Sequence, residues 1–137
     1  MIELTLSEID RLGRVGDLLL PPEPSLPAAS DVLRNGRLLL AALKARPDHV
    51  EQVKRVCAAL VEPTAESIGR LFAEDPQTMG AAANIVAGAY FMDEGVRSAI
   101  GYPGQLQNPA GLEDAADQLE GVLEPMMARE PFYRRET

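Results

Sequence analysis

The residues best suited to chemistry in this chain are its only histidine, His49, and its only cysteine, Cys57. Nucleophilic catalysis requires an imidazole within hydrogen-bond reach of a serine or cysteine. His49 follows Pro47 and Asp48 in what the sequence indicates is an exposed turn, so a solvent-facing side chain is favoured over a catalytic one. Cys57 lies on an apolar stripe with helical spacing, which favours a buried structural thiol over a reactive one.

Neither a metal centre nor a phosphate-binding loop is indicated. One histidine and one cysteine do not make a zinc site, and the Glu-x-x-His pairs of a di-iron bundle are absent from the sequence. Acidic pairs such as Asp93 and Glu94 fall at predicted helix starts, where negative charge favours the helix dipole. We therefore predict no catalytic residues, no metal and no cofactor on this chain, and no enzyme activity of its own.

Charge and hydropathy narrow the possible partners. The chain has 137 residues, with 21 acidic and 13 basic side chains and a formal charge of -8. Such a charge repels phosphate backbones, so nucleic acid is not an expected partner. The basic cluster of Arg129, Arg134 and Arg135 is diluted by glutamates and is interpreted as a solvated tail. No window approaches the ~18 apolar residues of a membrane span, and the start of the sequence is acidic, so we predict a cytoplasmic protein.

Helix signals dominate the sequence and predict an all-α fold. Thr5 and Glu8 have capping-box spacing, Asp75-Pro76 has the pattern of a helix start, and Gly101 can close a helix in the left-handed conformation. Four prolines in residues 21–28 predict an extended, proline-rich strap after the first helix. We predict a single-domain helical bundle of about six to seven helices over residues 1–128, followed by a tail over 129–137. The predicted helices cover about 6–20, 30–45, 48–61, 65–74, 76–92, 94–100 and 109–126, with the second capped by Ser30 and the fifth at the centre.

One aromatic cluster is not fully explained by capping and core packing. It spans residues 90–105 and combines aromatic, Met and Arg side chains, which are enriched in interface cores, with a rigid Pro-Gly turn. A partner-binding surface is one interpretation; packing of Tyr90 and Phe91 in the core, with Tyr102 folded back as a lid, is the other. The candidate partner-binding residues are Tyr90, Phe91, Asp93, Arg97, Tyr102, Pro103, Gly104 and Gln105.

Residues 88–104, Gly-Ala-Tyr-Phe-Met-Asp-Glu-Gly-Val-Arg-Ser-Ala-Ile-Gly-Tyr-Pro-Gly, resemble a stretch in the small subunits of gluconate 2-dehydrogenase-type enzymes. Leu18-Leu19-Leu20-Pro21-Pro22 is similar to the early helix of that family, which ends in an Ile-Pro element. The resemblance implies a helical accessory subunit, or chaperone-like partner, of a large flavoprotein oxidoreductase of the glucose-methanol-choline class. That partner would carry the FAD and the chemistry.

A second hypothesis is a small-molecule-binding domain that acts without an enzyme partner. Met79, Met92, Phe72 and Tyr90 would line a cavity between its helices. Homo-oligomerisation through an apolar seam over residues 112–126 is compatible with both hypotheses.

Overall fold

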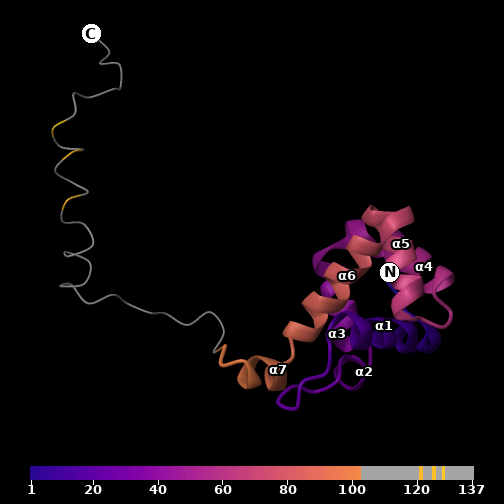
Figure 1. The fold of residues 1–137 in the computed structure, drawn as a ribbon, viewed down its shortest axis with the longest axis horizontal. Coiled ribbons are helices and arrows are strands. Elements are labelled where there is room, and N and C mark those ends of the chain that lie inside the picture. The colour runs from indigo at the N-terminus through magenta and orange to yellow at the C-terminus, as the bar shows by residue number, and fades with distance from the viewer. Residues whose placement is uncertain (103–120, 122–124, 126–127, 129–137) are drawn as a thin grey trace, which may run out of the picture. The chain divides into compact units, whose positions relative to one another are not determined.

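A computed structural model describes residues 1–102 together with positions 121, 125 and 128 (Figure 1). By its internal contacts the chain divides into one unit, Met1–Gly104, and a second, Gln105–Thr137. The described residues form seven α-helices and one 3-10 helix and contain no strand, which confirms the predicted all-α fold. The elements are α1 (Leu6–Leu19), α2 (Ala29–Val32), α3 (Arg37–Ala45), η1 (Pro47–His49), α4 (Val50–Ala59), α5 (Ala65–Glu74), α6 (Pro76–Phe91) and α7 (Glu94–Ala99).

The predicted helix over 109–126 and the predicted tail over 129–137 lie outside the described residues, apart from the three isolated positions. The boundary predicted at residue 128, between the single helical domain and the tail, falls in the same part of the chain. None of the helices in residues 1–102 is long and apolar enough to cross a membrane.

Side-chain caps fix several helix starts where the sequence predicts them. The Thr5 backbone N–H donates to Oε2 of Glu8 at 2.8 Å, and the Glu8 N–H donates to Oγ1 of Thr5 at 3.1 Å. Thr64 and Ser67 form the same reciprocal arrangement at α5. Asp75 accepts from the N–H of Thr78 at 3.2 Å and begins α6. These bonds satisfy backbone donors that have no partner within the helix.

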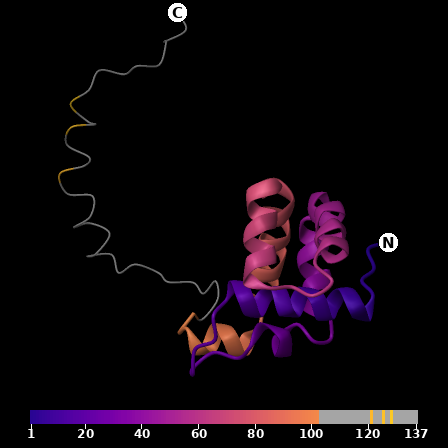
Figure 2. The same ribbon diagram turned by 45° about the vertical axis from the view of Figure 1, so that its right-hand side comes forward.

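Helix α6 is the central helix of the first unit, as predicted. It packs against α1, α3, α4, α5 and α7, and Figure 2 shows α1 running across the more upright helices. Aliphatic side chains supply most of the core, because the chain is only 4% aromatic. The largest fully buried side chains are Leu12, Leu33, Leu39, Leu43, Met79, Val15, Val53, Val56, Val86, Val96 and Cys57.

The prediction of one continuous helix over 30–45 is wrong. The chain leaves the helical path after α2, and Gly36 adopts the left-handed conformation with φ 73° before α3 begins. A Cβ at Gly36 would lie 2.5 Å from Cδ1 of Ile9, so glycine allows the close approach to α1. Ser30 does not cap the helix by its side chain; its backbone N–H donates to Oδ1 of Asp17 at 3.0 Å.

Residues 21–28, the proline strap, form no helix, which confirms the prediction for this segment. The strap is anchored to the central helix, because the Tyr90 hydroxyl donates to the carbonyl oxygen of Pro27 at 2.7 Å. The Asp17–Ser30 hydrogen bond joins α1 to the first turn of α2 across the same connection. The strap is therefore tied to the first unit at its C-terminal end, although residues 21–25 and 27 are exposed.

Candidate functional site

The candidate partner-binding residues that the structure describes lie at the end of α6 and in α7. Four large apolar side chains in residues 91–102 are each more than 40% exposed: Phe91, Met92, Ile100 and Tyr102. We call residues 91–102 the α6–α7 segment. Pro103, Gly104 and Gln105 lie outside the described residues. Exposed apolar side chains mark an interaction surface where they are grouped, and these four lie within twelve consecutive residues.

Tyr90 is a core residue. The candidate partner-binding surface therefore begins at Phe91. Only 3% of Tyr90 is exposed, and burial raises the pKa of its hydroxyl, with Asp93 and Glu23 adding to the effect. Its ring meets the ring of Phe91 edge to face, with centroids 5.3 Å apart and planes at 77°. This arrangement holds Phe91, which is exposed, against a buried neighbour.

Asp93 is the N-cap residue of α7. Its Oδ2 accepts from the N–H of Val96 at 3.0 Å and so caps α7. The cap fixes the direction in which the chain leaves α6. Asp93 therefore positions the α6–α7 segment, whether or not it also touches a partner.

Arg97 carries a buried polar atom without a partner. Its Nε is buried and has no hydrogen bond among the described residues. The side chain is half-buried and lines a hollow of about 260 Å³ together with Glu94, Ser98 and Tyr102. The N–H of Tyr102 donates to the Arg97 carbonyl at 2.8 Å, which keeps the two residues together. A guanidinium next to exposed aromatic and aliphatic side chains is a frequent composition of interface cores.

The prediction that His49 is a solvent-facing residue is wrong. Its side chain is only 14% exposed, and its Nε2 is buried without a hydrogen-bond partner in the described residues. The reason is that η1 runs directly into α4 and packs against α6. Nδ1 of His49 lies 3.6 Å from Oδ2 of Asp48, whose pKa is lowered to about 2 by the hydrogen bond from Arg46.

Cys57 is buried, as predicted, and only 2% exposed. Burial, reinforced by the nearby Glu8 carboxylate, raises the pKa of its thiol to about 11. A thiol with so high a pKa is almost entirely protonated near neutral pH and is a poor nucleophile. The structure thus supports a packing role for Cys57.

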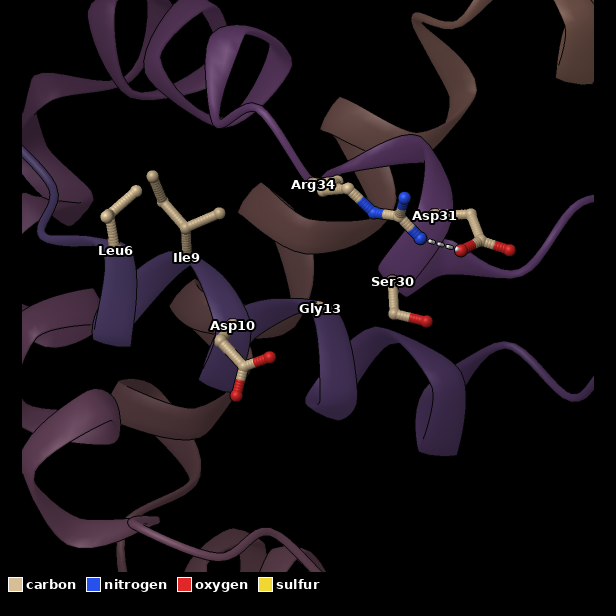
Figure 3. A pocket seen from close by; sticks show the side chains of 7 residues that line it. All are labelled: Leu6, Ile9, Asp10, Gly13, Ser30, Asp31 and Arg34. Atoms are coloured by element: carbon tan, nitrogen blue, oxygen red, sulfur yellow. Dashed lines mark hydrogen bonds and ion pairs between the residues drawn. The ribbon is translucent and has the colours of Figure 1, made fainter.

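A further hollow, of about 190 Å³, lies between α1 and the segment that contains α2 (Figure 3). Figure 3 shows the Arg34 guanidinium pointing to Asp31, to which it is bonded at 2.7 Å. Asp10, on the other side, pairs with Arg14 at 3.1 Å. Each charged side chain that lines this hollow pairs with a nearby residue of opposite charge, so the hollow offers no unpaired charge to a ligand.

The four residues of the predicted inter-helix cavity do not share one environment. Met79 and Tyr90 are buried in the core, whereas Phe72 is 36% and Met92 42% exposed. The described residues also include no group of three or more His, Cys, Asp or Glu side chains that could hold a metal ion. The best-supported candidate site in the predicted region is therefore the α6–α7 segment.

Comparisons with known proteins do not identify the chain. No family model, no curated protein and no solved structure matches it.

Proposed function

We propose that this chain is a non-catalytic accessory subunit, or chaperone-like partner, that binds a large FAD-dependent oxidoreductase through the α6–α7 segment. The observation that carries the proposal is the exposure of Phe91, Met92, Ile100 and Tyr102 within twelve consecutive residues that also include the partly buried Arg97. Aromatic residues, Met and Arg are the types over-represented where protein interfaces are most buried.

The identity proposed for the partner rests on the resemblance of residues 88–104 to gluconate 2-dehydrogenase-type small subunits. FAD is expected on the large subunit, which performs the chemistry, while this chain contributes folding or stability to the complex. A cytoplasmic location, predicted from the sequence, belongs to the same proposal.

Affinity capture of the tagged full-length chain from its native cells tests the proposal. The eluate would be analysed by mass spectrometry and by its flavin absorption spectrum. We expect one large flavoprotein in near-stoichiometric amount. An eluate with neither a flavoprotein nor a flavin spectrum would rule the proposal out.

A further inference from the structure

Two neighbouring hollows lie along one side of α6, away from the α6–α7 segment except at Met92. The first, of about 550 Å³, is lined mainly by polar side chains, including His49, Gln52 and Asn84. The second, of about 300 Å³, is lined mainly by apolar groups, including Ala42, Ala45, Ile85 and Met92. His49 and Asn84 line both hollows, so the two adjoin. Volumes in this range accommodate small organic ligands.

Glycines on α6 keep these hollows open. Gly80 lines the polar hollow and Gly88 the apolar one. A Cβ at either position would meet nothing within 4 Å. Both glycines lie inside a 16-residue helix, where glycine is less favourable than alanine, and neither is needed for close helix packing in the described unit.

Two side chains that line the polar hollow each carry a buried polar atom with no hydrogen-bond partner among the described residues. Nε2 of His49 and Oε1 of Gln52 are buried and make no hydrogen bond among residues 1–102. A buried polar group without a hydrogen-bond partner lowers the stability of the fold. A bound molecule that donates to or accepts from such a group reduces this free-energy cost. Because neither atom is accessible to water, a bound molecule reaches them only after the imidazole and the amide rotate about their terminal torsions, which are broad. The exposed Asn84 amide adds one donor group and one acceptor group.

Charge at the site favours a neutral ligand. Arg46 and Asp48 are the charged residues that line the two hollows, and they bind each other through two hydrogen bonds of 3.0 and 2.8 Å. A ligand ion would have to shed water without meeting an uncompensated opposite charge.

We infer that the two hollows form one binding site for a neutral, amphipathic small molecule. The head of the ligand carries both a donor and an acceptor, as a primary amide does, and lies against His49, Gln52 and Asn84. Its apolar tail lies over Gly88 between Ala42, Ile85 and Met92. The described residues of the free chain form this site, and it shares only Met92 with the α6–α7 segment.

Titration of the full-length chain with hexanamide, followed by amide proton–nitrogen NMR, tests the inference. Hexanoate and hexylammonium serve as matched probes with the same tail and a charged head. We expect saturable shifts at η1, α4 and α6, with hexanamide binding about tenfold more tightly than either ion. Equal affinities for the three probes, shifts confined to other residues, or no saturable binding in the millimolar range would overturn the inference.

Gly88→Leu is the decisive variant, because its side chain enters the open apolar hollow and leucine is a better helix former than glycine. We expect about tenfold weaker hexanamide binding with no loss of melting temperature. Gly69→Leu is the matched control, since Gly69 is exposed on α5 and a Cβ added there would likewise meet nothing within 4 Å. Unchanged binding by Gly88→Leu, or equal weakening by Gly69→Leu, would contradict the site.

Discussion

At the scale of single residues, the Tyr90 hydroxyl connects the central helix to the proline strap. It donates to the Pro27 carbonyl at 2.7 Å from a side chain that is almost fully buried. Together with the bond between Asp17 and the Ser30 N–H, this bond holds the C-terminal end of the strap to the first unit.

Tyr90→Phe removes this hydrogen bond and keeps the ring. We expect the free energy of unfolding to fall by about 1 kcal/mol, the usual net value of such a bond. Urea denaturation followed by circular dichroism measures the change. Tyr102→Phe is the control, because Tyr102 is 48% exposed and should change stability little. A Tyr90→Phe variant as stable as the original chain would show that the bond does not contribute.

Glu8 links the start of α1 to α4 through its carboxylate. Burial alone would raise its pKa, but hydrogen bonds from Lys54, at 2.8 Å, and from the Thr5 N–H outweigh burial and hold the pKa below its usual value. A lowered pKa in the folded state means that Glu8 stabilises the fold above the ordinary glutamate pKa of 4.5, and that this contribution is lost as the pH falls through the folded-state pKa.

Glu8→Gln should therefore lower stability at neutral pH and make stability less dependent on pH in the acid range. Urea denaturation at neutral pH and below pH 4.5 compares the two forms. Glu66→Gln is the control, since that side chain is 84% exposed. An acid-induced loss of stability that is as steep in Glu8→Gln as in the original chain would contradict this role.

At the scale of elements, Gly36 separates α2 from α3 and Gly101 follows α7, with nearly equal φ of 73° and 74°. An alanine at either position costs about 1 kcal/mol for the left-handed conformation. At Gly36 the added Cβ would also lie 2.5 Å from Cδ1 of the buried Ile9, whereas nothing lies within 4 Å at Gly101. A comparison of the two alanine variants therefore distinguishes the cost of the backbone conformation from the cost of side-chain crowding.

We expect Gly36→Ala to lower the melting temperature more than Gly101→Ala does. Differential scanning calorimetry of the two variants measures the difference. Equal losses would indicate that Ile9 moves aside at no cost, and that only the backbone conformation requires glycine at Gly36.

Local signals in the sequence predict most of the helix starts but not every helix. Thr5 with Glu8, Thr64 and Asp75-Pro76 act through bonds within one turn, so neighbouring residues suffice to predict them. The helical spacing of apolar residues continues across Gly36, which favours one continuous helix over 30–45. The local pattern that marks the break is the Asn35-Gly36 dipeptide, a common turn signal, where the Arg37 N–H donates to Oδ1 of Asn35 at 3.0 Å.

In the candidate sites too, the sequence indicates which residues are involved, whereas tertiary packing decides which of them are buried. The aromatic cluster after residue 90 is visible in the sequence, but whether Tyr90 or Phe91 faces the core depends on how α6 packs. His49 looks exposed because Pro47 and Asp48 precede it, and its burial comes from contact between η1 and α6. The one sequence signal for the hollows beside α6 is a long helix with no charge that contains Gly80 and Gly88.

At the scale of the whole molecule, a formal charge of -8 and the exposed apolar residues of the α6–α7 segment favour a protein partner over nucleic acid. The proposed partner of this segment is a large flavoprotein. Serine at Phe91 and Tyr102 removes two exposed aromatic side chains, and the change at Phe91 also removes its edge-to-face contact with the buried Tyr90. Val61→Ser is the matched control, because Val61 is 57% exposed and lies outside the segment.

The most direct measurement is the amount of flavoprotein captured per mole of full-length chain by the original protein, by Val61→Ser and by the double variant Phe91→Ser/Tyr102→Ser. We expect near-stoichiometric flavoprotein with the first two and about tenfold weaker binding with the double variant, as loss of interface anchors usually gives. Absence of flavoprotein from the original protein, or equal capture by the double variant, would contradict the account.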